Sequence, residues 1–568
     1  MLIESVAAFI GRFTLAEKIQ SKEGMARRIP WPTDERVSSA IFIYMSNLSR
    51  REFAQEFAKL LAAAGLATGL PLRALPASPQ NDAPPAQAPV LEPSASKQPS
   101  SGDRMVGIQV GAVSFVDEGI APVLDRFQRE VGINTLFLAT YSYGRGIAGR
   151  QVPGQPLPDH GKQEYDTDYH GGNFARTHEQ YYAHTPLKKI QAPDYGDFDV
   201  VAAIVPEAKS RGMKTFCWYE DSFRRDLEGL EPLLEVTLSG KRASTACFHN
   251  PGVQAFWQAL TEDYLRSYPI DGIMWGSERQ GPFGNALGAS AGGARHDPLE
   301  ISCFCRFCES EAKSRGIDPQ RAREGYTKLA ALVRDSRSGT RPADGYFVSY
   351  WRLLVQYPEI LAWEKLWNDG QKNAYKNIYR LAKSIRPETA VGWHIWHNNS
   401  FSPFYRAEQD YNEFRGYSDF LKIVMYNNCG GPRLASYIDS VSHSIFADLS
   451  PDATLDLMYK DLNYKESRLS DLPHSGLSAD YVDRETRRAL AGVQGADKKD
   501  PADKAIKIWP GIDIDIPTGD NEKKTQPEDV RQAVRAALNA GAHGVILSRK
   551  YSEMRLANLR AAGDGLRA

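Results

Sequence analysis

The amino-acid sequence predicts a (β/α)8 TIM barrel of the α/β class, with long loop insertions at its C-terminal face, over residues 104–568. From residue 105 onward, eight short apolar runs alternate with amphipathic segments of helical length. Polar, aromatic and charged residues collect directly after these runs, where such barrels carry their active loops. No Gly-x-Gly-x-x-Gly fingerprint follows the first run, which argues against a nucleotide-binding doubly wound sheet.

The first half of the barrel is predicted from four apolar runs. These expected strands are 106–115, 134–143, 214–219 and 272–275. Amphipathic spacing predicts helices between them at 118–130, 200–211 and 253–268. The fourth strand runs straight into a polar turn that carries Glu278 and Arg279, so this turn is the first place to look for chemistry.

The second half of the barrel follows a Cys-rich insertion at about 283–345. A long helical pattern covers 346–385, and Pro358 is expected to interrupt it because proline cannot donate to the helix ladder. The remaining expected strands are 391–396, 420–426, 506–515 and 544–548. A helix is predicted at 526–540, and another closes the chain.

The first hundred residues have a different composition. Residues 1–44 are interpreted as disordered or as a miscalled gene start, with Met45 as the true start. Residues 45–77 resemble a twin-arginine signal, because the Arg50-Arg51 pair precedes a modestly apolar run and small residues. Residues 78–103 read as a disordered linker rich in Pro, Ala, Ser and Gln.

The signal predicts a periplasmic or extracellular protein whose export partner is the twin-arginine machinery. The alternative for this segment is an amphipathic surface helix or an uncleaved anchor. No later apolar run is long enough for a stable membrane span in the mature protein. The 70 acidic and 69 basic residues nearly cancel, so the composition gives no reason to expect a nucleic-acid partner.

Five carboxylates follow the predicted strands on the face expected to be active: Glu220, Asp221, Glu278, Asp513 and Asp515. Glycoside hydrolysis needs two carboxyl groups, one protonated as acid and one charged as nucleophile or base. We expect Glu278 to be the acid, with its pKa raised by apolar surroundings and a second carboxylate, and Asp513 to be its partner. Asp515 and Glu220 are further catalytic candidates, while a salt bridge or helix cap is the alternative for any single one.

Aromatic and polar side chains near the same rim are candidates for carbohydrate binding, because aromatic faces stack on sugar rings. About half of the aromatic members are expected to fill the core instead. The candidates are Tyr141, Trp218, Trp275, Arg279, His394, Trp396, Tyr426, Asn427 and Arg549.

Three of the six cysteines are clustered as Cys303-x-Cys305-x-x-Cys308. Three thiolates at this spacing can bind one tetrahedral Zn²⁺ if a fourth ligand comes from elsewhere. Cys247 is the best fourth ligand, with His249 or His296 as substitutes. The alternatives are a disulfide within the cluster and simple burial of the thiols.

These motifs resemble the zinc-containing beta-galactosidases of glycoside hydrolase family 42, which have a (β/α)8 catalytic domain. The resemblance covers roughly 214–309 and implies that Glu278 is the acid/base. It also implies a structural zinc site formed by Cys247, Cys303, Cys305 and Cys308. The chain differs from the family in having Ser277 where the family has Asn, and aspartates rather than Glu after the seventh strand.

The sequence therefore predicts an exported glycoside hydrolase with a structural zinc ion and no organic cofactor. One alternative is a non-catalytic carbohydrate-binding barrel of the cell envelope. The other is a metal-dependent hydrolase or isomerase that uses His394, Glu220 and Asp513 around a second metal.

Overall fold

A computed structural model describes residues 104–290, 297–494 and 505–567. The segments interpreted as start region, twin-arginine signal and linker lie outside the described residues, so these interpretations stay predictions. Among the residues described, no helix combines the length and apolar content needed to cross a bilayer.

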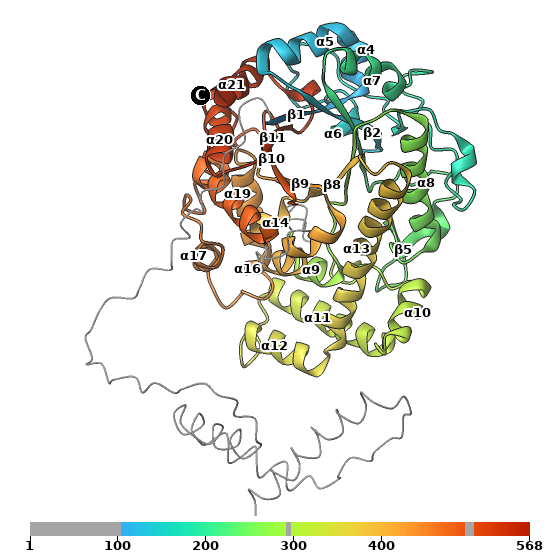
Figure 1. The fold of residues 1–568 in the computed structure, drawn as a ribbon. Coiled ribbons are helices and arrows are strands. Elements are labelled where there is room, and N and C mark those ends of the chain that lie inside the picture. Colours follow the sequence, from blue (N-terminus) through green and yellow to red (C-terminus); the bar gives the residue numbers. More distant parts are fainter. Residues whose placement is uncertain (1–103, 291–296, 495–504, 568) are drawn as a thin grey trace, which may run out of the picture. The chain divides into compact units, whose positions relative to one another are not determined.

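Eight parallel strands form a closed barrel, which confirms the predicted fold (Figure 1). Each strand pairs with the next along the chain, and β1 pairs with both β2 and β11, so the sheet has no open edge. A short antiparallel strand, β3 (Gly172–Asn173), adds to β2. The barrel strands are β1 (Met105–Gly111), β2 (Thr135–Ser142), β4 (Lys214–Glu220), β7 (Gly272–Gly276), β8 (Ala390–Ile395), β9 (Phe420–Val424), β10 (Lys507–Asp513) and β11 (Gly544–Ser548).

Large aromatic side chains fill the lower part of the barrel. Phe420 stacks on Trp509 with ring centroids 4.2 Å apart, and Phe137 and Phe216 pack against both rings. Nearly all residues of the eight strands are buried, as expected where helices cover a parallel sheet. Because these aromatic rings fill the lower part of the barrel, polar side chains gather at the C-terminal ends of the strands.

Helices surround the strands in a ring (Figure 1). Their starts are marked by capping residues: Asp199 accepts from the backbone N–H groups of Val201 and Ala202, and Asn250 caps the next helix ahead of Pro251. The helices that follow barrel strands include α4 (Ala112–Glu118), α5 (Ile120–Arg126), α7 (Val200–Ser210), α8 (Pro251–Ser267), α13 (Glu359–Ile385), α16 (Gly430–Ser442), α17 (Pro451–Leu462), α19 (Ala479–Gln494), α20 (Pro527–Asn539) and α21 (Leu556–Arg567).

The insertion after β7 forms a helical layer outside this ring (Figure 1). It contains α9 (Pro282–Leu287), α10 (Arg306–Ser314) and α11 (Pro319–Arg337), followed by α12 (Tyr346–Gln356). The predicted interruption at Pro358 is confirmed, because α12 ends before this proline and α13 begins after it. The first strand is shorter than predicted, since its apolar run continues into α4 after Gly111.

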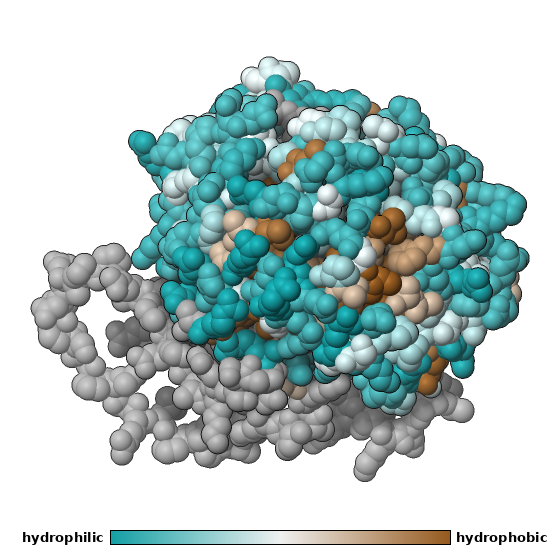
Figure 2. Space-filling view, turned by 90° about the horizontal axis from the view of Figure 1, so that it is seen from above, coloured by the Kyte–Doolittle hydropathy of each residue, from teal (hydrophilic) through white to brown (hydrophobic). Residues whose placement is uncertain are grey.

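Most of the surface in Figure 2 is hydrophilic, with small hydrophobic groups scattered across it. Elsewhere, α12 exposes Phe347, Val348, Trp351 and Val355. A short hairpin of β5 (Leu234–Val236) and β6 (Arg242–Ala246) precedes α8 and leads to Cys247.

Candidate active site

Glu278 lies just beyond β7, and its two neighbours in the chain fix its direction. Ser277 Oγ and Arg279 Nε each donate to the same carboxylate oxygen of Asp221 at 2.8 Å. Because successive side chains of an extended segment point to opposite sides, Glu278 is turned away from Asp221. Its carboxylate is directed instead at β8, where Oε1 lies 2.7 Å from His394 Nε2.

A hydrogen-bonded chain continues from Glu278 into the barrel. The other ring nitrogen of His394, Nδ1, lies 3.1 Å from the Nζ of Lys422 on β9. Lys422 Nζ also donates to the hydroxyl of Tyr426 at 2.8 Å. Since the lysine donates to Nδ1, the network assigns the proton of a neutral His394 to Nε2, which then donates to Glu278.

Two glycines make room for this chain of side chains. A β-carbon on Gly276 would lie 2.8 Å from the β-carbon of His394, and one on Gly511 would lie 2.5 Å from Cε of Lys422. Contacts this short are not tolerated between packed atoms. The glycines of β7 and β10 therefore help to set the positions of His394 and Lys422.

The charge state of Glu278 is opposite to the one predicted from the sequence. Burial acts to raise the pKa of Glu278, but the hydrogen bond and charge of His394, with Arg433 and Lys422, lower it to about 2. The predicted raised pKa is therefore wrong, because the positive groups from β8, β9 and α16 cannot be seen from the fourth strand alone. Glu278 is a carboxylate at neutral pH, and its side chain is 53% exposed.

The two groups behind Glu278 have lowered pKa values. Burial and the ammonium group of Lys422 lower the pKa of His394, so its imidazole is neutral near pH 7. Burial lowers the pKa of Lys422 to about 7, although Glu278 and Glu220 act in the other direction. Lys422 is fully buried within the otherwise apolar strand β9.

Glu220 ends β4, the strand next to β7, and has the opposite charge preference. Its Oε2 accepts a hydrogen bond from Ser142 Oγ at 3.1 Å. Burial, together with the negative charge of Glu278, raises the pKa of Glu220 to about 8. At neutral pH the mouth of the barrel therefore holds one protonated and one charged carboxyl group on neighbouring strands.

The two aspartates of the seventh strand are used differently from the prediction. The carboxylate of Asp513 is fully buried and accepts from the backbone N–H groups of Asn428 and Cys429 at 3.1 and 3.0 Å. Asp515 accepts from Arg555 and Asn558 at the start of α21. Both carboxyl groups bind local backbone and side-chain donors, and the predicted pairing of either with Glu278 stays a prediction.

Several predicted binding residues belong to the interior. Tyr141, Trp218 and Trp275 are buried and offer no exposed face for a sugar. Arg279 is paired with Asp221 and Glu235, and its guanidinium lies 4.2 Å from the ring centroid of Phe248. These four residues therefore pack inside the protein around the site and do not form its exposed surface.

The remaining predicted residues lie at or just below the strand ends. His394 contacts Glu278 directly, and Tyr426 is buried beneath it as the partner of Lys422. Arg549 binds Glu553 through two nitrogens and is partly exposed. The amide oxygen of Asn427 is buried and has no hydrogen-bond partner among the residues that the structure describes. Trp396 is half-buried, and its ring packs edge-on against Tyr405.

Sequence reasoning missed Lys422 and Arg433 as members of the site, whereas His397 was expected near the end of the fifth strand as a possible hydroxyl or metal ligand. A lysine in the middle of the apolar run 420–424 was the available signal for Lys422, because an unpaired lysine is rarely buried. Arg433 in α16 carried no comparable signal, since only the fold brings it to His397.

Two cavities in the described part of the chain are lined by residues other than Glu220 and Glu278. Glu118, Arg150 and His160 are among the residues lining one of them. Asn427, Glu466 and Gly476 are among those lining the other. Neither contains Glu278, whose position at the end of β7 and partial exposure place it in an open mouth.

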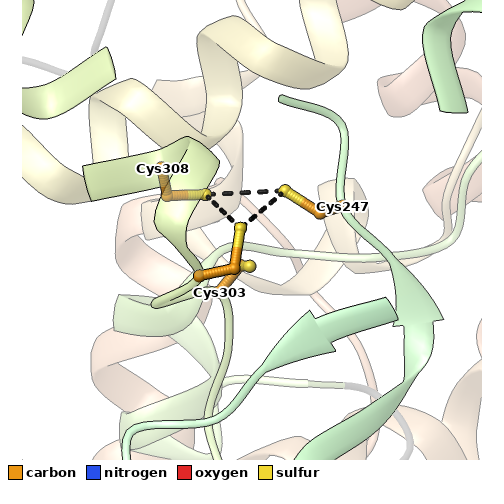
Figure 3. A group of neighbouring side chains, drawn as sticks. Cys247, Cys303 and Cys308 are labelled. Carbon is orange, nitrogen blue, oxygen red and sulfur yellow. Dashed lines mark hydrogen bonds between the residues drawn. The ribbon is translucent and has the colours of Figure 1, made fainter. Parts of the chain in front are cut away.

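Four cysteines meet beside the β7 turn, as predicted. Figure 3 shows the Cys247, Cys303 and Cys308 side chains pointing toward one another. The Sγ atom of Cys247 lies 3.6 Å from that of Cys308 and 3.5 Å from that of Cys305, and all four Sγ atoms lie within 4.8 Å of one another. Zn–S bonds of about 2.3 Å in a tetrahedron require sulfur separations of roughly 3.8 Å, so the group fits a zinc ion.

The other ligand combinations considered for the cysteines do not occur among the described residues. No disulfide links them, and His249 Nε2 is bonded to the carbonyl of Leu366. His296 lies outside the described residues. In the described part of the chain, the four-cysteine group is the one cluster of three or more His, Cys, Asp or Glu side chains arranged to hold a metal.

No model of a protein family matches the chain, and no curated protein matches it. Among solved structures, it is similar to the PgaB (BpsB) glycoside hydrolase domain from Bordetella bronchiseptica, with 11% identity, a TM-score of 0.38, and coverage of 78% of this chain and 94% of that one. It is also similar to the beta-galactosidase from the psychrophilic Marinomonas ef1, with 9% identity and a TM-score of 0.43, covering 82% of this chain but only 59% of that one. A chitinase from Chromobacterium violaceum shows 9% identity, a TM-score of 0.34 and coverage of 82% and 99%. These likenesses are distant, and the barrel is established by its strand pairing.

Proposed function

We propose that the protein is a glycoside hydrolase in which Glu220 is the acid and Glu278 is the charged carboxylate. One observation carries the proposal: two carboxyl groups follow neighbouring barrel strands, and their surroundings move their pKa values apart, to about 8 and about 2. Such a split assigns acid and base roles in a carboxyl pair. The twin-arginine signal predicted from the sequence remains the sole basis for placing the activity outside the cytoplasm.

The reaction follows from these charge states. Glu220 donates its proton to the glycosidic oxygen as the bond from that oxygen to the anomeric carbon breaks. Glu278 stabilises the positive charge that develops on the sugar, either by bonding to the anomeric carbon or by taking a proton from an attacking water. If Glu278 bonds to the sugar, water then gives hydroxide to the anomeric carbon and its proton to Glu220. If Glu278 instead takes the proton from water, it passes that proton to solvent, and Glu220 regains one from solvent. In both routes one glycoside and one water give two hydroxyl products.

His394 and Lys422 act as positioning residues for Glu278 in this proposal. The Nε2–H of His394 fixes one carboxylate oxygen, and Lys422 holds the imidazole in the tautomer that donates. Their hydrogen bond and positive charge keep Glu278 ionised in acid. Ser142 positions Glu220 by donating a hydrogen bond to its Oε2. The other carboxyl oxygen, Oε1, can then donate its proton to the glycosidic oxygen.

Hydrolysis of a glycan panel by the wild-type chain and by Glu278→Gln tests the proposal. The wild type should release reducing ends from at least one glycan, and Glu278→Gln should lose about 10²–10⁴-fold of that rate. Glu262→Gln, the same change in a surface residue of α8 that pairs with Arg266, is the matched control and should keep full activity. Hydrolysis that survives unchanged in Glu278→Gln would rule out this assignment.

NMR of the first product formed would separate the two roles left for Glu278. Retention of the anomeric configuration indicates a bond between Glu278 and the sugar, and inversion indicates attack by water.

We also propose a structural zinc ion at Cys247, Cys303, Cys305 and Cys308. The four buried sulfurs, which all lie within 4.8 Å of one another, support it. When bound, zinc would tie the hairpin that ends near Cys247 to the start of α10. Arg279 connects the same hairpin to the active-site turn, since it donates to the carbonyl of Ala246 at 3.0 Å.

A further inference from the structure

Arg433 places a positive charge at the barrel mouth. It is in the first turn of α16, where its side chain is half-buried. Its Nη1 donates to Nδ1 of His397 at 3.0 Å, and within the described residues it forms no ion pair. Buried and half-buried arginines are normally paired with a carboxylate, so this one is unusual.

The group that holds Arg433 does not neutralise it. The imidazole of His397 is buried, and its other nitrogen, Nε2, lies 3.1 Å from the hydroxyl of Tyr481. Burial and the charge of Arg433 keep the pKa of His397 well below its ordinary value, so the ring is a neutral acceptor. The guanidinium is thus fixed in position while it retains its charge and most of its donors.

A second arginine lies nearby. Arg549 follows β11, binds Glu553 through Nε and Nη2, and has a side chain that is 26% exposed. Its Nη1 lies beside Gly146, where a β-carbon would come within 3.4 Å. The positive charge of Arg549 disfavours the charge of Arg433, and Tyr426 and Cys429 lie near both arginines.

The acids near this pair are already engaged. Asp513 is held by the backbone N–H groups of Asn428 and Cys429, and Glu278 is bonded to His394. The charge of Arg549 is matched by Glu553, whereas Arg433 forms no ion pair among the described residues and its charge is offset only at longer range by Glu278. Two positively charged guanidinium groups near each other at the barrel mouth favour binding of an anion. The paired N–H groups of arginine match the oxygens of carboxylate, sulfate and phosphate groups.

We propose that Arg433, with Arg549, binds an anionic substituent of the sugar chain, a uronate carboxylate or a sulfate ester, beside Glu278. This inference rests on the proposed glycosidase function and names its substrate class: acidic rather than neutral polysaccharide. Arg433 forms the recognition contact through its free donors, and Arg549 contributes through Nη1. Neutral sugars lack the group that these donors bind.

Binding can be measured separately from hydrolysis in the full-length Glu278→Gln variant. Affinity electrophoresis would use gels that contain polygalacturonate, carrageenan or neutral galactomannan. The variant should be retarded by polygalacturonate or carrageenan more than by galactomannan. Adding Arg433→Gln should weaken the anionic interaction about tenfold or more and leave galactomannan mobility unchanged.

Two further variants complete the design. Arg129→Gln removes the same charge from an exposed side chain outside the mouth, so it controls for general attraction to polyanions. Arg433→Lys retains the charge without the fork and should recover part of the affinity, which guards against a variant that simply misfolds. Stronger retardation by polygalacturonate identifies a carboxylate ligand, and stronger retardation by carrageenan identifies a sulfate.

Equal effects of Arg433→Gln and Arg129→Gln, or equal binding of neutral and acidic glycans, would overturn the inference. If neutral glycans alone are hydrolysed and Glu278→Gln abolishes this, the inference fails while the glycosidase function stands. If Glu278→Gln leaves hydrolysis intact, the proposed function fails, and the binding measurements still decide whether the arginines hold an anion.

Discussion

Replacing His394 with leucine should move the acid limb of the pH–activity profile upward. Leucine fills a similar volume but offers no hydrogen bond to Glu278. Without that bond and the histidine charge, the pKa of Glu278 should rise from about 2 toward its ordinary 4.5. Because the pKa is lowered in the folded enzyme, the active carboxylate form is present above it and is lost as the pH falls through it.

The size of the effect follows from this shift. At about pH 3.5, a carboxyl group with a pKa near 2 is almost fully ionised, whereas one with a pKa near 4.5 is about one-tenth ionised. The ratio of kcat/KM at pH 3.5 to that at pH 6 should therefore fall by about tenfold in His394→Leu relative to the wild type.

The assay is kcat/KM from pH 2.5 to 9 on the best glycan of the panel, with circular dichroism at each pH to confirm folding. His443→Leu, a change at a partly exposed histidine directly after α16, is the control. An acid limb that stays in place in His394→Leu would refute the reasoning about the hydrogen-bonded chain.

Three other perturbations test separate parts of the structure. Glu220→Gln should slow hydrolysis of glycans by about 10²–10⁴-fold. Nitrophenyl glycosides should lose much less activity, because their leaving group needs little protonation. Equal losses on both substrates would contradict the role of Glu220 as the acid. Cys305→Ser should reduce bound zinc from about one ion per chain and lower the melting temperature, measured by metal analysis and calorimetry; wild-type protein purified without zinc would exclude the site. Gly511→Ala should push Lys422 away from His394, costing roughly 1–3 kcal/mol of stability and lowering kcat, whereas an unchanged stability and rate would show that the close packing is not required.

The fold was predictable because each barrel strand has a local signature. The run that forms β11 was predicted with the bounds that the structure has, and the break at Pro358 followed from proline chemistry alone. The end of β1 was misjudged because Ala112 to Phe115 are as apolar in α4 as they would be in a strand. Apolar runs do not reveal where a strand becomes a buried helix.

The site was only partly predictable because its electrostatics depend on distant contacts. Glu278 was identifiable from its place after the fourth strand, yet its charge state depends on His394 and Arg433, more than a hundred residues later. Asp513 looked like a partner by the same rule, but backbone donors after β9 bind its carboxylate. Glu220 was one candidate among several until the barrel placed it next to β7.

The cysteine cluster was predictable because its ligand spacing is local. Three of its four members fall within six residues, Cys303 to Cys308, and such spacing is specific to metal sites. Only Cys247 required the fold, which brings the end of the β5–β6 hairpin to the start of α10.

The central claim is that Glu220 holds a proton and Glu278 a negative charge in the same site at neutral pH. Carbon-13 NMR of glutamate side chains, with the two signals assigned from Glu220→Gln and Glu278→Gln, measures this directly. The account predicts that Glu220 titrates near pH 8 in the wild type and at lower pH in Glu278→Gln, because the neighbouring charge is gone. Titration of both groups near their ordinary value of 4.5 would contradict it.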